Sequence, residues 1–173
     1  NYIHDTSRYS MELNTGYAYV HDNLMGLNNK PFRINESNGG PNGDHNTITH
    51  NTLYSTTLHL NEDDDGACYN TITNNIIIGA EDHSKLGSCY LFPYSDKIGY
   101  STNTFDYNLY NSVNVVYHNK NSYTLDGWKT FSQQDRNSMV GSPVFINTSG
   151  SMTQIADFAL AVNSPGKSAA SVW

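Results

Sequence analysis

Asn46-Thr-Ile-Thr-His-Asn51-Thr-Leu53 has a near copy in Asn70-Thr-Ile-Thr-Asn-Asn75-Ile-Ile77. Each copy reads as a short strand, a turn marked by Asn, and the start of another strand. Three further segments fit this template, the last of them more weakly: 18–25, 103–110 and 1–6. Self-similarity at periods of roughly 20 to 50 residues is the signature of a repeat architecture. Because the copies are β in character, the sequence predicts a coil of strands.

Each predicted turn also carries a second strand, in segments 11–14, 32–35, 58–61 and 89–92. Strand side chains alternate between two faces, so the first and third residues of each segment should stack inward. The expected inward columns are Met11, Phe32, Leu58 and Cys89, and Leu13, Ile34, Leu60 and Leu91. The Asn residues at the turns form a further column: Asn23, Asn51, Asn75 and Asn108. Asn tolerates left-handed backbone and bonds neighbouring peptide groups, and stacked amides pair along the axis of such a coil.

The composition fits a solenoid better than a disordered chain. Only 37% of the 173 residues are hydrophobic, but the chain contains 13 Tyr, and disordered chains are poor in aromatic residues. The narrow core of a solenoid needs few apolar residues per turn. The formal net charge is −7 and the Lys and Arg residues are scattered, which argues against a nucleic-acid partner. No apolar run reaches membrane-spanning length, so we expect no membrane insertion, and no signal peptide is recognisable.

The chain divides into residues 1–120, the expected turns of the coil, and residues 121–173, a capping segment of the same domain. In the second part, Leu125, Trp128 and Phe131 lie at helical spacing and predict a short amphipathic helix within residues 123–134. Three later segments are expected to lie with this helix over the last turn, since terminal repeats need a cap: 138–147, 157–160 and 163–166. The sequence starts inside a repeat, so we expect further turns of a longer chain upstream.

The residues resemble the right-handed parallel β-helix proteins of the pectate-lyase-like superfamily. Those proteins repeat an Asn-x-Ile-x-x-Asn-x-Ile turn and finish on a distinctive C-terminal ending. The matching residues here are Asn1-Tyr-Ile-His-Asp-Thr6, Asp106-Tyr-Asn-Leu-Tyr110, Trp128, Asp135-Arg-Asn-Ser-Met-Val140, Pro143-Val-Phe145, Asp157-Phe-Ala-Leu160 and Ser164-Pro165. The resemblance implies an all-β, right-handed parallel β-helix with a short helix-bearing C-terminal cap. It implies no single activity, because the superfamily includes polysaccharide lyases, glycoside hydrolases, epimerases, phage tailspikes and proteins without known catalysis.

The outward positions of the second strand form the most interesting column: Glu12, Arg33, His59 and Tyr90. Arg33 would bind a carboxylate of an acidic sugar. His59 would act as general acid or base, with Glu12 or Glu62 as partner carboxylate. Aromatic stacking and further polar contacts to substrate would come from Tyr90, Phe92, Asn35, Asn61 and Glu36. The alternative is a solvated strand face whose charges pair between turns, and a register slip by one residue would bury these side chains.

Three other groups of residues have potential chemistry. Asp63, Asp64 and Asp65 supply the oxygen ligands that calcium prefers, although acidic turns are also common on acidic proteins. His4 and His21 occupy equivalent positions in two copies, which predicts a stacked, hydrogen-bonded surface pair rather than a metal site. Cys68 and Cys89 lie about one turn apart and form either a disulfide or two buried thiols.

The sequence therefore predicts a secreted or cell-surface domain that acts on or binds polysaccharide, with calcium as a candidate cofactor. If it is catalytic, lyase or hydrolase chemistry is expected at Glu12, Arg33, His59 and Glu62. The alternative is a non-catalytic structural or adhesive β-helix, such as a spike or stalk module.

Overall fold

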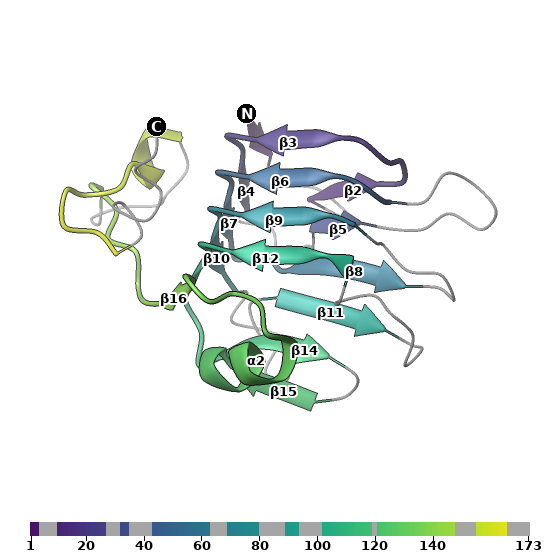
Figure 1. Ribbon diagram of the computed structural model, residues 1–173. Coiled ribbons are helices and arrows are strands. Elements are labelled where there is room, and N and C mark those ends of the chain that lie inside the picture. Colours follow the sequence, from purple (N-terminus) through teal and green to yellow (C-terminus); the bar gives the residue numbers. More distant parts are fainter. Residues whose placement is uncertain are drawn as a thin grey trace.

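The computed structural model describes residues 1–3, 10–26, 32–34, 43–62, 69–79, 89–93, 102–118, 121–147 and 155–165. These residues form a mostly β structure with three sheets (Figure 1). Sheet A contains, in spatial order, β1 (Tyr2–Ile3), β4 (Leu24–Gly26), β7 (Thr52–Tyr54), β10 (Ile76–Ile78), β13 (Leu109–Tyr110) and β16 (Met139–Val140). Sheet B contains β15 (Asn121–Thr124), β14 (Asn114–His118), β11 (Cys89–Pro93), β8 (Leu58–Glu62), β5 (Phe32–Ile34) and β2 (Met11–Leu13). Sheet C contains β12 (Thr104–Asp106), β9 (Thr71–Thr73), β6 (Thr47–Thr49) and β3 (Tyr19–His21).

The chain visits sheets C, A and B in turn, and each circuit adds one strand to every sheet (Figure 1). Neighbouring strands pair in parallel, except that β14 and β15 are antiparallel. The template of strand, Asn turn and strand is thereby confirmed, since β6 and β7 flank Asn51 in the described structure. The mostly β class predicted from the sequence is also confirmed.

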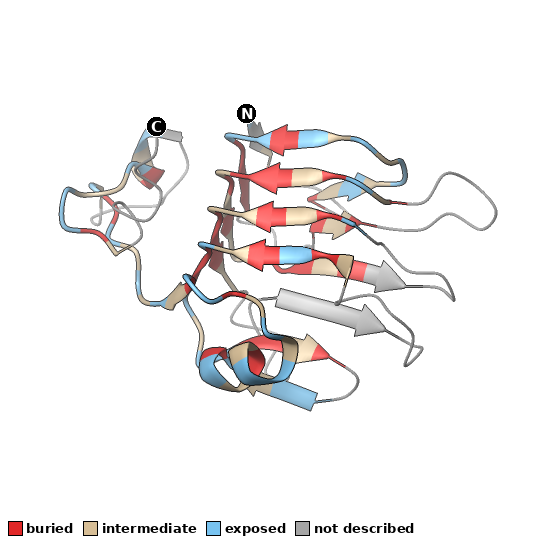
Figure 2. Cartoon of the chain, in the orientation of Figure 1, coloured by how far each residue is buried: buried red, intermediate tan, exposed pale blue. Residues whose placement is uncertain are grey.

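The predicted register of the second strand, which belongs to sheet B, is confirmed along both inward columns. Met11 pairs with Phe32, Phe32 with Leu58, and Leu58 with Cys89. The Leu13, Ile34, Leu60 and Leu91 positions pair in the same way. Phe32, Ile34, Leu58 and Leu60 meet the inward residues of sheets A and C in one buried cluster. Its other members include Val20, Ile48, Ile72, Phe105, Met25, Leu53 and Ile77. Figure 2 shows these buried positions repeating from strand to strand in sheet C. Burial of this apolar surface is the main favourable term in folding.

The turns between sheets C and A are held by a ladder of buried Asn amides, as predicted. The Nδ2 of Asn23 donates to Asn51 Oδ1 at 3.0 Å, and the same bond links Asn51 to Asn75 at 3.1 Å. Asn75 continues the series to Asn108 at 3.2 Å. Each side chain also bonds peptide groups: Asn75 Nδ2 donates to the carbonyls of Ile48 and Thr73, and its Oδ1 accepts the backbone N–H of Asn51. The ladder therefore satisfies peptide groups that the turn would otherwise leave buried without partners.

The left-handed backbone at these turns belongs to the residue before each ladder Asn, not to the Asn itself. Four preceding residues have φ values between 54° and 57°: Asp22, His50, Asn74 and Tyr107. The tolerance of Asn for left-handed backbone, which the sequence analysis gave as one reason for the Asn column, is therefore not used by the ladder residues. Asn is needed for its amide, and the strained position tolerates several residue types.

The first copy of the repeat, Asn1 to Thr6, was aligned in the wrong register. Ile3 pairs with Met25 in sheet A, so it is not the equivalent of Val20 in sheet C. Asn1 instead extends the ladder, since its Nδ2 donates to Asn23 Oδ1 at 3.0 Å. Each repeat contains two Asn-x-apolar patterns, one before each strand, and the short first copy matches either of them.

The predicted amphipathic helix is present as α2 (Leu125–Ser132). Thr124 caps its N-terminus by accepting the N–H of Gly127, and Gln133 ends it with a φ of 61°. Leu125 and Trp128 are buried as expected, whereas Phe131 is 44% exposed although its ring contacts Tyr123. The helix packs against β14 and β15, at the end of the stack of strands (Figure 1).

A fully buried carboxylate, Asp135, closes the Asn ladder at this end. It accepts hydrogen bonds from Trp128 Nε1 at 3.0 Å, from the Tyr110 hydroxyl at 3.2 Å, and from Ser138. Asn108 Nδ2 lies 3.4 Å from the same carboxylate. Burial raises the pKa of Asp135 above its usual value, while the four donors oppose this effect. The helix, the ladder and strand β13 of sheet A thus meet at one residue.

The segment after β16 is not placed as expected. β16 joins the last turn by pairing with β13, but Phe145 and Phe158 pack against Leu24 and Tyr54 on the outer face of sheet A. The C-terminal end thus lies beside the N-terminal strands (Figure 1). The outer face of sheet A presents the apolar side chains of Leu24, Ile76 and Leu109, and this segment shields part of that face from water.

Replacement of Asn75 by Ala should lower the free energy of unfolding by about 3 kcal/mol or more, because several buried donors and acceptors lose their partners together. Urea unfolding measures this change. The control is Asn114→Ala, at an exposed strand position, which should cost about 0.5 kcal/mol or less. Equal losses in the two variants would contradict a structural role for the ladder.

Asp135→Asn tests the buried carboxylate through its pH dependence. Because the pKa of Asp135 is raised in the folded state, folding favours its protonated form. The free energy of unfolding of the parent protein, measured relative to the Asn variant, should therefore be greatest below about pH 4. It should fall as the pH rises toward the pKa of Asp135 in the folded protein. Unfolding of both proteins across this range measures the difference. A difference that grows with pH would show that the hydrogen bonds, not burial, dominate this pKa.

Candidate functional site

The outer face of sheet B carries the column that the sequence analysis singled out. Glu12 pairs with Arg33, Arg33 with His59, and His59 with Tyr90 on successive strands. Arg33 lies between the buried Phe32 and Ile34 on β5 and is itself half-buried, as expected for an outward residue on a short strand. The register is therefore confirmed, and these positions lie about 4.8 Å apart from strand to strand.

Two contacts fix the charged end of this column. The Arg33 Nη1 atom lies 3.6 Å from Glu12 Oε1, and both side chains remain partly exposed. His59 Nε2 forms a 2.9 Å hydrogen bond with the hydroxyl of the buried Thr57. This hydrogen bond orients the imidazole of His59, which neighbours Arg33 on the next strand. The carboxylate of Glu12 lies on the opposite side of Arg33.

The column extends one strand further than the sequence analysis proposed. Tyr90 pairs with Tyr117 on β14, and Tyr117 is half-buried beside the fully buried Val116. The alternation of buried Val116, outward Tyr117 and buried His118 was a readable signal. It was missed because β14 follows a different spacing from the earlier strands.

Several predicted site residues are described only by their backbone positions. In the pairing of β11 with β8, Phe92 lies opposite Asn61 and Pro93 opposite Glu62. The side chains of Asn61, Glu62, Tyr90 and Phe92 lie outside the described part of the structure. Six further residues lie wholly outside it: Asn35, Glu36, Asp63, Asp64, Asp65 and Cys68. The side chain of Cys89 also lies outside it. The calcium and disulfide predictions therefore stay predictions.

The described residues contain no group of three His, Cys, Asp or Glu side chains that could hold a metal ion. The predicted pairing of His4 with His21 is not supported, because Ile3 aligns with Met25 and His4 itself lies outside the described residues. His21 instead forms a 2.7 Å contact with the carboxylate of Asp22.

An exposed aromatic stack was missed by the sequence analysis. The rings of Tyr17 and His45 lie 4.9 Å apart, and those of His45 and Tyr69 lie 5.0 Å apart, with interplanar angles of 11° and 21°. Tyr17 is 81% exposed and Tyr69 is 57% exposed. Each residue precedes a repeat strand with a positive φ, and the signal was an aromatic ring at the same place in three copies. The stack borders sheet C rather than sheet B.

Comparisons of the chain with protein-family models, with curated proteins and with solved structures gave no match. Among the described residues, no helix has the length and apolar character needed to span a bilayer. The geometry of the column is therefore the basis for assigning a function. It places the carboxylate of Glu12, the guanidinium of Arg33, the imidazole of His59 and the phenol of Tyr117 on one face, with the backbone position of Tyr90 in register between His59 and Tyr117.

We expect the charged column to tolerate substitution without loss of the fold. Because Glu12 and Arg33 are partly exposed, replacing Glu12 with Gln should change the free energy of unfolding by about 1 kcal/mol or less. Thermal or urea unfolding measures this change. A much larger loss would mean that the pair is a structural element, and variants of it would then be unsuitable for functional assays.

Proposed function

We propose that the chain is a right-handed parallel β-helix domain of the pectate-lyase-like superfamily, and that it binds and processes polysaccharide outside the cell. The fold assignment is supported by three sheets of mainly parallel strands, visited in constant order, and by a buried Asn ladder at the turns between sheets C and A. Further support comes from the ending motif, whose Trp128, Asp135 and Ser138 meet in a single hydrogen-bonded cluster.

The observation that carries the functional proposal is the adjacent placement of Arg33 and His59 on the outer face of sheet B. A sugar chain lying along the coil axis would cross these residues in succession. Arg33 offers a planar pair of donors that matches a carboxylate. Tyr117, at the other end of the described column, offers an apolar ring with a polar tip.

The same pair supplies what a lyase acting on an acidic polysaccharide needs. A base must remove the proton next to the sugar carboxylate, and a cation must stabilise the negative charge that develops there. The C–O bond to the leaving sugar then breaks as the double bond forms, and the leaving oxygen takes a proton from the protonated base or from water. His59 is suited to the first role and Arg33 to the second. Hydrolysis would instead require two carboxylates on either side of the bond, for which Glu12 and Glu62 are the candidates.

A non-catalytic structural or adhesive role is the second candidate, and a specific observation favours it. Arg33 contacts Glu12, and His59 bonds to Thr57, so the charged groups of the column are already partnered within the protein. A substrate carboxylate would have to displace Glu12 from Arg33. In a stalk or spike module the same contacts would simply stabilise the face.

The test is a depolymerisation assay on acidic and neutral polysaccharides, with calcium or with a chelator, following unsaturated ends and reducing ends separately. Catalysis predicts that His59→Ala lowers the rate by about 100-fold or more while the protein stays folded, as expected for loss of a general base. The matched control is His21→Ala on sheet C, which should retain the parent rate.

Unsaturated products would identify a lyase and reducing ends without unsaturation a hydrolase. Loss of activity with the chelator would support calcium at Asp63, Asp64 and Asp65. Binding without turnover would favour the adhesive role. Absence of both turnover and binding across the panel would contradict the proposed function.

A further inference from the structure

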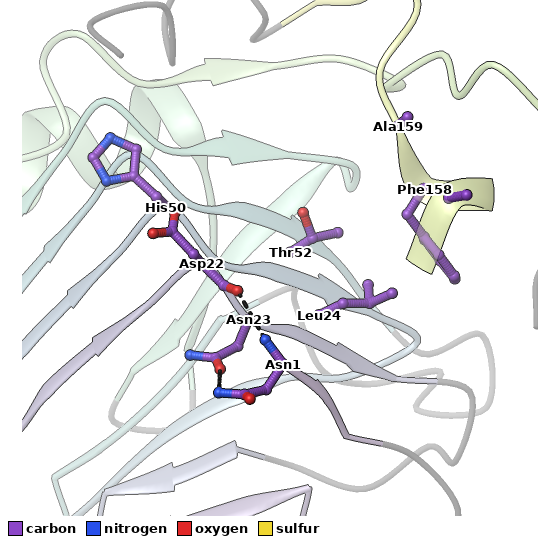
Figure 3. Close-up of a pocket in the computed structure, with 9 residues that line it drawn as sticks. Asn1, Asp22, Asn23, Leu24, His50, Thr52, Phe158 and Ala159 are labelled. Carbon is purple, nitrogen blue, oxygen red and sulfur yellow. Dashed lines mark hydrogen bonds between the residues drawn. The ribbon is translucent and has the colours of Figure 1, made fainter. Parts of the chain in front are cut away.

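A cleft of about 390 Å³ lies between the first strands of sheet A and the C-terminal segment (Figure 3). Its lining residues are Asn1, Asp22, Asn23, Leu24, His50, Thr52, Ala156, Phe158 and Ala159. This volume is at the low end of the roughly 300–1,000 Å³ typical of small-molecule sites. The cleft is on a different sheet from the column of Glu12, Arg33 and His59, and it does not depend on the function proposed for that column.

One wall of the cleft is polar and rigidly positioned. Asp22 and His50 occupy equivalent places on adjacent turns, with φ values of 54° and 56°, and each precedes a residue of the Asn ladder. Asp22 Oδ2 contacts His21 Nδ1 at 2.7 Å, and His50 Nδ1 lies 3.1 Å from the Thr49 hydroxyl. Within the described residues, the second carboxylate oxygen of Asp22 makes no hydrogen bond. Figure 3 shows the two side chains next to each other at one side of the cleft.

The opposite wall is apolar and comes from the C-terminal segment. Figure 3 places Phe158 and Ala159 across the cleft from Asp22, with Leu24 and Thr52 between them. Phe158 is held by edge-to-face contacts with Tyr54, at 5.1 Å, and Phe145, at 5.6 Å. The ring is 8% exposed, so its position is fixed by packing on sheet A.

The lining chemistry limits the ligand. The cleft contains no Lys or Arg side chain, and the Asn1 amino group that lines it already donates to the backbone carbonyl of Asp22 at 3.2 Å. A phosphate or carboxylate would therefore meet the Asp22 carboxylate without a positively charged Lys or Arg side chain to offset the repulsion. Organic cations are favoured by open aromatic faces, whereas Phe158 is almost fully covered. What remains is a neutral molecule with hydroxyl groups along one edge and C–H groups along the other. We propose that this cleft binds one neutral sugar unit, with its hydroxyls on Asp22, His50 and Thr52 and its apolar edge against the exposed side chains of Ala156 and Ala159.

Ligand-observed NMR with the methyl glycosides of glucose, galactose and mannose tests this site directly. At least one glycoside should bind. Asp22→Asn should weaken its binding about tenfold or more, since a hydrogen bond to a charged group is lost. Ala159→Leu should have a similar effect by filling the cleft from the opposite wall. Asn suits the left-handed backbone at position 22, so this variant is expected to fold, and its melting temperature checks that it does.

The control is Asn74→Asp, the reverse exchange at the equivalent place two turns further on, outside the cleft, and it should not change the affinity. Binding that is lost in His59→Ala but kept in Asp22→Asn would place the sugar on sheet B and overturn the proposal. Failure of all three glycosides to bind would also overturn it, as would binding of benzylammonium in their place.

Discussion

The buried Asn ladder is the constraint on which the rest of the structure depends. A chain that turns sharply between two sheets at every circuit buries peptide groups that the strand pairing does not reach, and leaving such groups without partners is costly. Asn51 and Asn75, in the middle of the ladder, each bond peptide groups on their own turn and the neighbouring one, in addition to the next Asn. Because the amides must stack, the turns must stack, and the strands on either side are thereby held in register.

The ladder also explains the low apolar content of the chain. Each circuit contributes few core residues, for example Ile48, Leu53, Leu58 and Leu60 in the second full turn. Polar contacts between neighbouring turns supply the rest of the stabilisation. At the end of the ladder the repeated amide is replaced by Asp135, whose acceptor atoms bind the helix, the last Asn and Ser138. A charged acceptor is costly to bury, but it satisfies the donors of a terminal turn that has no following Asn.

Much of this structure could be predicted from the sequence, because period and alternation are local properties. Strand register on sheet B followed from aligning Phe32 with Leu58, and the helix followed from the spacing of Leu125 and Trp128. The prediction that Ile3 is equivalent to Val20 was wrong because two similar Asn-x-apolar patterns occur in every turn. The predicted position of the C-terminal segment was wrong for another reason. Packing of Phe145 and Phe158 on Leu24 and Tyr54 is a contact between distant parts of the chain, and no periodic pattern encodes it.

The candidate site was predictable only as a row of positions. The pairing of Glu12 with Arg33 and of Arg33 with His59 followed from the repeat. The bond between His59 and Thr57 depends on side-chain conformation and could not be predicted in this way. Nor could the cleft beside Asp22, since one of its walls comes from the distant residues Ala156 to Ala159.

A crystal structure with a bound acidic oligosaccharide tests the central functional claim most directly. The account predicts a sugar chain along the outer face of sheet B, with a carboxylate on Arg33 in place of Glu12 and a sugar ring carbon within reach of His59. An oligosaccharide bound on another face, with the contact between Glu12 and Arg33 intact, would contradict it.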